Sequence, residues 1–240
     1  MNLARIAGAL APALAALVAV LAVAPRDAHA VAACYSNQGF APGAGVKLPR
    51  HPRIAWYVDR PPPGRTPQLT ATIDGAAVPV KLSTVRSPPY TIRILEIDSD
   101  RTGHLELRGD ATASYQIVAD AAMPKDVPVV VGRTQVELRH TTVREKFDAL
   151  ALRLPLAAPA IVAHVKVRRD AQARWSELDV PVVATDLGDP RPAIRLGELG
   201  CTRNYSVDLL AAGVDLEVTI TLADGTTRPA AELPAHVALP

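Results

Sequence analysis

The sequence predicts an all-β protein, made of two tandem antiparallel β-sandwich domains that follow an N-terminal signal peptide. Three observations predict this fold. Short segments in which apolar and polar residues alternate recur beyond residue 52, and this period of two indicates strands with one buried face. Turn dipeptides separate these segments at short intervals. The 22 prolines favour short strands joined by loops, because proline interrupts both helices and central strands.

The clearest strand lies near the C-terminus, at residues 216–222, where four large apolar side chains alternate with three polar ones. Asp224-Gly225 follows almost at once, and this dipeptide tolerates the positive φ angles of a tight hairpin turn. Gly213, before the strand, is suited to the bend that starts it. A strand with this pattern needs a second sheet to cover its apolar face.

The first 30 residues have the features of a secretory signal peptide. A basic residue precedes an uncharged apolar run at residues 6–24, and Ala28-His29-Ala30 then forms a small-x-small cleavage box. We therefore expect residues 1–30 to be removed and the mature protein to be exported. The apolar run is also about long enough to span a membrane, so an uncleaved anchor is the alternative.

The two cysteines, Cys34 and Cys201, are interpreted in the light of export. In an oxidising compartment an even number of cysteines predicts a bridge, and these two residues form the one available pair. The alternative is a lipoprotein, because residues 31–34 (Val-Ala-Ala-Cys) are similar to a lipobox in which Cys34 would be acylated. Membrane association is expected only if Cys34 is acylated or the signal is uncleaved.

The remaining predicted strands form two blocks. In the first block they are residues 53–59, 69–73, 78–82, 90–97, 104–108 and 114–118. In the second block, before the strand at 216–222, they are residues 135–139, 149–154, 161–168, 180–183, 190–196 and 205–209. Residues 34–52 are predicted to be an irregular lead-in, and the one short helix candidate is residues 142–149.

The blocks define the predicted domains. The first sandwich covers residues 31–118 and the second covers residues 129–240. Residues 119–128 lose the alternation and contain two prolines, which predicts a linker.

Two segments resemble known sandwich families. Leu210, Gly213 and Leu216, followed by Asp224-Gly225, resemble the penultimate strand and turn of fibronectin type III domains, in which an aromatic residue usually occupies the place of Leu216. Residues 42–56 (PGAGVKLPRHPRIAW) resemble the opening of bacterial Ig-like domains of exported proteins. These resemblances imply a fold and leave the function open.

The sequence predicts no catalytic, cofactor-binding or metal-binding residues. It contains no nucleophile elbow, phosphate-binding glycine loop or His-x-x-x-His motif. Ser83, Ser87 and Ser206 have no His and acidic residue at a recognised spacing. The net charge of +2 and the small number of aromatic residues, two Trp, five Tyr and two Phe, argue against nucleic acid as a partner.

A few groups of ionisable residues carry weaker hypotheses. Asp98 and Asp100 share a predicted turn that could hold calcium, and Glu96 and Asp98 could act as paired acids; a solvated acidic turn is the simpler interpretation of both. His164 is expected to be a partly exposed strand residue. Lys166, Arg168 and Arg169 form a basic strip that suits protection of a sheet edge.

Copper binding is a further hypothesis, by similarity to the CopC type of periplasmic copper carrier. It would require His29 at the mature N-terminus, and Met123 is the one methionine after the signal.

We therefore expect an exported, non-catalytic interaction or scaffold protein of the periplasm or cell surface of a bacterium. No cofactor is expected, and the partner would be an unknown protein or another envelope component. The alternatives are a lipid-anchored envelope protein, an unrecognised hydrolase, or a CopC-like copper-binding protein.

Overall fold

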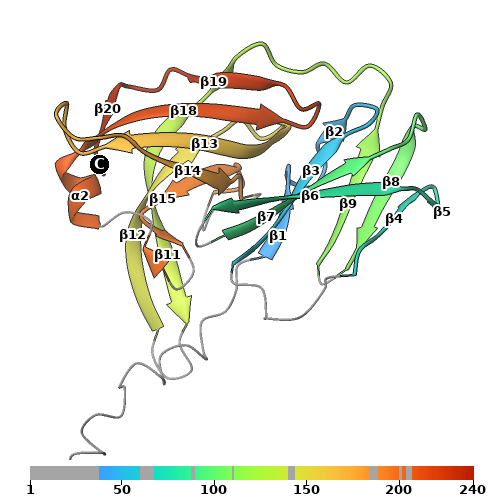
Figure 1. Ribbon diagram of the computed structural model, residues 1–240, viewed down its shortest axis with the longest axis horizontal. Helices are drawn as coiled ribbons and strands as arrows, with labels where there is room; N and C mark the ends of the chain where they lie inside the picture. Colours follow the sequence, from blue (N-terminus) through green and yellow to red (C-terminus); the bar gives the residue numbers. More distant parts are fainter. Residues whose placement is uncertain are drawn as a thin grey trace, which may run out of the picture. The chain divides into compact units, whose positions relative to one another are not determined.

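Strands make up most of the part of the chain that the structure, a computed structural model, describes (Figure 1). That part comprises residues 38–59, 68–87, 90–109, 111–139, 144–183, 189–199, 202–203 and 207–240. The prediction of an all-β chain is confirmed, and the sheets described below are consistent with a β-sandwich fold.

Residues up to 118 form two sheets. The first has the strand order β1-β3-β7-β6, with strands Gln38–Ala41, Arg53–Asp59, Tyr90–Ile97 and Val80–Ser87. The second has the order β2-β9-β8-β4-β5, with strands Lys47–Leu48, Thr112–Ile117, Gly103–Arg108, Thr70–Ile73 and Ala76–Ala77. Pairing is antiparallel except between β2 and β9.

Residues from 127 onward form three further sheets. The largest has the order β10-β19-β18-β13-β14, with strands Val127–Pro128, Thr227–Ala231, Val214–Leu222, Ala160–Arg168 and Ser176–Pro181, and β20 (His236–Val237) also pairs with β18. A three-stranded sheet has the order β11-β12-β15, with strands Val130–Arg139, Arg144–Arg153 and Ala193–Leu196. β16 (Glu198–Leu199) and β17 (Thr202–Arg203) form a small hairpin.

Alternation in the sequence corresponds to alternation in burial. In β18 every second residue from Val214 to Leu222 is buried, and the residues between them are more exposed. The turn at Asp74-Gly75 joins β4 to β5 as a two-residue hairpin, with φ angles of 48° and 80°. Both angles are positive, which is the geometry of a tight hairpin turn. At the predicted tight turn, Asp224-Gly225, only Gly225 has a positive φ, of 84°.

Three local predictions are wrong. Residues 207–209 lie in a short helix, α2 (Val207–Ala212), in place of the predicted strand, and Leu210 of this helix is fully buried. Tertiary packing of Leu210, followed by Gly213 with a φ of 93°, favours one helical turn over an extended chain. The helix predicted at 142–149 is strand β12 from Arg144 onward, because it pairs with both β11 and β15.

The third wrong prediction concerns the irregular lead-in. It contains β1 and β2, which pair with β3 and β9. Among the described residues, no helix is long and apolar enough to cross a membrane.

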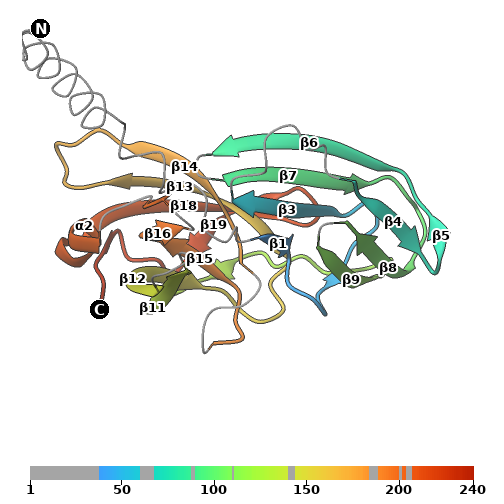
Figure 2. The ribbon, with the colours of Figure 1, turned by 90° about the horizontal axis from the view of Figure 1, so that it is seen from below.

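Residues 35–240 cluster as one compact unit. The main-chain N–H of Arg53, at the start of β3, donates a 2.6 Å hydrogen bond to the carbonyl of Ala223, at the end of β18. β13 also contacts β1 and β3, and the edge strands β6 and β14 contact each other (Figure 2). The four larger sheets are arranged like the blades of a propeller, and they do not form two clearly separate tandem sandwiches (Figure 1).

Candidate binding cavity

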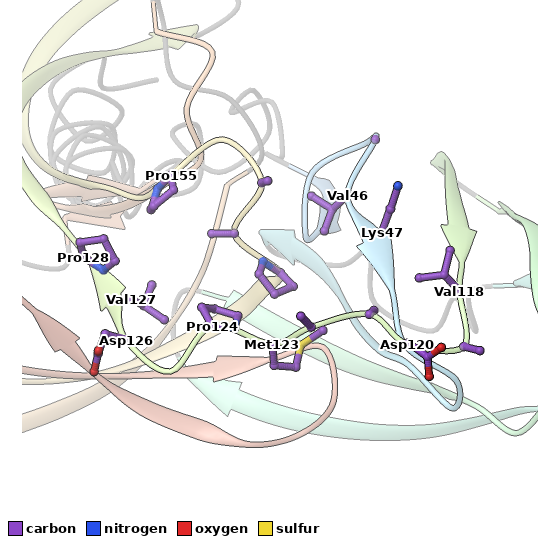
Figure 3. A pocket seen from close by; sticks show the side chains of 17 residues that line it. Val46, Lys47, Val118, Asp120, Met123, Pro124, Asp126, Val127, Pro128 and Pro155 are labelled. Atoms are coloured by element: carbon purple, nitrogen blue, oxygen red, sulfur yellow. The ribbon is translucent and has the colours of Figure 1, made fainter.

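A cavity of about 800 Å³ lies where the two halves of the sequence meet (Figure 3). Three segments line it: residues 45–47 before and within β2, residues 118–128 between β9 and β11, and residues 155–159 between β12 and β13. The predicted linker, residues 119–128, therefore forms a wall of the cavity, and it ends in β10. Cavities that hold small molecules or parts of larger partners commonly enclose about 300–1,000 Å³.

The walls of the cavity are mainly small and apolar. Of the lining residues, Val46, Val127 and Ala158 are buried, while Met123 and Pro124 are half-buried. Both of the lining segments that follow β9 contain prolines, at positions 124, 128, 155 and 159. Proline has no N–H group, so these positions offer carbonyl oxygens and apolar rings without donors. Such a surface suits an apolar group whose polar neighbours can donate hydrogen bonds.

Three charged side chains stand at the rim, and all three are exposed: Lys47, Asp120 and Asp126. Asp126 lies at one end of the lining, whereas Lys47 and Asp120 lie toward the other end (Figure 3). Within the described residues none of the three makes an ion pair or a side-chain hydrogen bond, in contrast to Asp98, Asp189 and other carboxylates of the surface. Their charges are available to a partner.

The wall formed by residues 121–126 also has free main-chain groups. It is held at both ends, because the N–H of Val118 bonds to Leu48 and the N–H of Val129 bonds to Ala231, at distances of 2.9 and 3.0 Å. Between these anchors residues 121–126 have no regular secondary structure and make no main-chain hydrogen bond to any residue that the structure describes. Main-chain groups without a partner in the described chain can bond to water or to a binding partner.

Several residues named in the sequence analysis lie outside the described residues. They are both cysteines, Cys34 and Cys201, together with His29 and Ser206. The bridge between the two cysteines and the acylation of Cys34 both stay predictions.

The acidic turn at Asp98 and Asp100 faces a lysine and a histidine of the protein itself. Lys81 Nζ lies 2.9 Å from Asp98, and His51 Nε2 lies 2.9 Å from Asp100. The hydrogen bond from Lys81 lowers the pKa of Asp98 below its ordinary value. The other member of the suggested acid pair, Glu96, lies 3.7 Å from Arg53. In the described part of the chain, no three His, Cys, Asp or Glu side chains form a group that could hold a metal ion.

The outer face of β13 carries the predicted basic strip. His164 is partly exposed, as expected, with Nδ1 3.0 Å from Asp179 of β14, and Lys166 pairs with Glu177 at 3.6 Å. Arg168 contacts the ring of Trp175 and donates to Asp215 of β18 at 2.9 Å. Acids of neighbouring strands therefore balance the strip, and its charges do not form a free basic patch.

Asp215 and His236 form an arrangement that resembles part of the acid–base machinery of hydrolytic enzymes. Nδ1 of His236 lies 3.0 Å from Asp215, and His236 and Arg168 together lower the pKa of that carboxyl. The opposite edge of the imidazole, however, packs against Gly213, where it fills the place that a Cβ would take. This contact fits a role in holding β20 against β18.

Comparison with known proteins leaves the family open. No family model and no curated protein matches the chain. Among solved structures, pullulanase type I from Bacillus subtilis with bound maltose matches at 9% identity and a TM-score of 0.24, covering 81% of this chain and 24% of the enzyme. The tandem Ig repeats of Dlar match at 10% identity and a TM-score of 0.23, covering 86% of this chain and 99% of that one.

The N-terminal Ig1-2 module of the Drosophila receptor protein tyrosine phosphatase DLAR gives similar values, 11% identity and a TM-score of 0.24, with 85% and 98% covered. The chain thus spans about a quarter of the length of the pullulanase. Likenesses with TM-scores this low carry no argument about function.

Sequence reasoning missed the cavity. Its lining consists mostly of Ala, Val and Pro in loops, residue types that carry no chemical signature. The available signal was compositional: residues 119–128 combine small apolar residues, two prolines and charged residues, a mixture that indicates a linker as readily as a binding wall.

Proposed function

We propose that this protein is an exported, non-catalytic interaction protein of the periplasm or cell surface, and that it binds a partner in the cavity. The observation that carries this proposal is the construction of the cavity. Its lining comes from the first half, from the second half and from the segment that connects them. A site made in this way exists only when the two halves are joined.

We further propose that each half is an Ig-type sandwich. In the first half, β1, β3, β7 and β6 have the pairing order of the A-B-E-D sheet of Ig domains, and β4, β8 and β9 occupy the places of C, F and G. A propeller blade is a separate four-stranded sheet repeated around a channel, whereas this order mixes strands that are distant in sequence. The pairing order therefore supports the Ig interpretation.

In the second half, β11, β12 and β15 would be strands A, B and E, and β13, β18 and β19 would be strands C, F and G. This assignment makes β18 the penultimate strand, which agrees with the resemblance of its sequence to fibronectin type III domains. Leu216 replaces the usual aromatic residue of that strand. It is buried, with 4% of its surface exposed, and its main-chain N–H bonds to Ala235 at 3.1 Å.

The walls of the cavity supply the energy for binding. Complete burial of a Val, Leu or Met side chain of a partner contributes about 1.5–3 kcal/mol. The rim adds unpaired charges that can select a partner by sign. Export follows from the signal peptide predicted at residues 1–30, and it would place the cavity in contact with proteins of the envelope.

Capture of a partner from an envelope extract tests the proposal. The bait is the full chain, compared with the variant Ala157→Trp, which places a large ring at an exposed position of the lining. Ala171→Trp is the matched control, because Ala171 is equally exposed in the turn between β13 and β14 and is not part of the lining. We expect a protein that the wild type and Ala171→Trp retain and Ala157→Trp loses. Equal capture by all three baits would contradict binding in the cavity.

A further inference from the structure

We infer that the occupant of the cavity is an extended segment of another protein, which lies along residues 121–126 with an apolar side chain in the cavity and a basic side chain beside Asp126. This inference rests on the proposed function and specifies the chemistry of the partner. Three independent observations support it: the free main chain of the wall, the extent of the apolar surface, and the distribution of charge at the rim.

The free main chain favours a peptide over a compact small molecule. Residues 121–126 present six carbonyl oxygens and five N–H groups, since Pro124 has none, and these groups are unpaired within the described residues. An extended peptide carries main-chain donors and acceptors of its own along its length, so it can satisfy several of them at once. The interruption at Pro124 predicts that pairing is confined to a few residues on either side of it.

Exposed apolar residues adjoin the lining of the cavity in sequence. Among the described residues, three large apolar side chains are more than half exposed, and two of them are close to lining residues in the sequence. Leu156, between lining residues Pro155 and Ala157, is 62% exposed, and Val130, two residues after Pro128, is 52% exposed. Exposed apolar residues beside a cavity are typical of interaction surfaces. An occupant that covers them must be longer than the cavity itself.

The rim gives the occupant a direction. Asp126 is the single charged lining residue at its end of the cavity, whereas Asp120 at the other end has Lys47 nearby (Figure 3). A lysine or arginine of the partner would therefore be favoured beside Asp126. At the other end the two opposite charges favour a polar or neutral residue.

Selection from a phage-displayed library of random 12-residue peptides, with the full chain as target, tests the inference. We expect enriched peptides that carry an apolar residue and, a few positions away, a lysine or arginine. Their affinity is then measured by fluorescence anisotropy for the wild type and for paired variants. Ala157→Trp should weaken binding at least tenfold, while Ala171→Trp should leave it unchanged.

A charge reversal tests the direction of the occupant. Asp126→Lys should weaken binding about tenfold, and most of this loss should vanish when the basic residue of the peptide is replaced by glutamine. Glu232→Lys is the control, because Glu232 is an exposed acid outside the lining. Circular dichroism confirms that each variant is folded. If Ala157→Trp does not fold, Ala122→Trp provides the same obstruction from a second exposed lining position.

Other results would overturn the inference. They are peptides that bind Ala157→Trp or Asp126→Lys as tightly as the wild type, or a library that yields no enriched peptide. If the envelope extract nevertheless gives a partner that Ala157→Trp loses, the proposed function holds and only the extended occupant is wrong. A concentration-dependent dimer that Ala157→Trp abolishes would assign the cavity to a second copy of the chain, which also overturns the inference.

Discussion

Replacing Gly225 by alanine should weaken the joint between the two halves of the protein. Gly225 lies in the turn between β18 and β19 with a φ of 84°, and the guanidinium of Arg53, at the start of β3, packs against it. An added Cβ would lie 2.6 Å from Nη1 and 2.9 Å from Cζ of Arg53. The guanidinium must therefore move, which disturbs its packing against the turn and its ion pair with Glu96.

The magnitude follows from these contacts. A left-handed backbone costs alanine about 1–2 kcal/mol relative to glycine. The exposed pair of Arg53 with Glu96, 3.7 Å apart, contributes about 0–1 kcal/mol, whereas the main-chain hydrogen bond from Arg53 to Ala223 does not depend on the position of the guanidinium. Loss of the pair therefore adds at most about 1 kcal/mol to the backbone cost. We expect Gly225→Ala to lower the free energy of unfolding by about 1–3 kcal/mol.

Gly75 provides the matched control. It also follows an aspartate in a turn after a strand, its φ is 80°, and a Cβ there would meet no atom within 4 Å. Gly75→Ala should therefore show the backbone cost alone. Urea denaturation, followed by tryptophan fluorescence, measures both variants, and the Arg53→Ala background should remove the difference between them. Equal losses for Gly75→Ala and Gly225→Ala in the wild-type background would refute the contact with Arg53.

Three further predictions concern an ion pair, a buried indole and the cysteines. The hydrogen bond from Arg191 lowers the pKa of Asp189 from 3.8 to about 2, so its stabilising effect is complete above about pH 4 and is lost as the pH falls toward 2. Urea midpoints measured across that range should therefore vary less in Asp189→Asn than in the wild type; an identical acid dependence would contradict this. Trp56→Phe should cost well under the roughly 3–5 kcal/mol of Trp56→Ala, because it also removes a buried Nε1–H that has no acceptor among the described residues, and urea denaturation followed by circular dichroism compares the two. Mass spectrometry of the unreduced exported protein should find a peptide linked through Cys34 and Cys201, whereas a diacylglyceryl group on Cys34 would contradict the bridge.

The long strands could be predicted from the sequence because their burial depends on local alternation. Residues 90–97 and 161–168 illustrate this, since strands β7 and β13 differ from the predicted bounds by at most one residue. The two-residue turn at Asp74-Gly75 was predictable for a related reason: its backbone angles exclude most other residue types.

Short elements were not predictable, because their partners in space decide them. β1 and β2 contain only four and two residues and no clear alternation, yet each pairs with a longer strand. At residues 207–212, the burial of Leu210 and the turn at Gly213 select a helix that a six-residue pattern could not distinguish from a strand.

The cavity depends on tertiary structure even more than these short elements do. Its lining is assembled from three loop regions that lie far apart in the sequence, and no single region has an unusual composition apart from residues 119–128. That segment is anchored to β2 at one end and to β19 at the other. Between these two anchors, residues 121–126 make no main-chain hydrogen bond to any described residue.

If the cavity requires both halves in their present positions, a change in the joint should also affect binding. Gly225 is not part of the lining, so Gly225→Ala removes no contact with an occupant. It should nevertheless weaken a peptide that binds the cavity, by about three- to tenfold, because a loosened joint lowers the population of the binding-competent arrangement. Gly75→Ala should leave the affinity unchanged, since a Cβ at that turn meets no other part of the described chain. Fluorescence anisotropy with a selected peptide decides between them: equal affinities for both variants would show that the joint at Gly225 does not control the cavity.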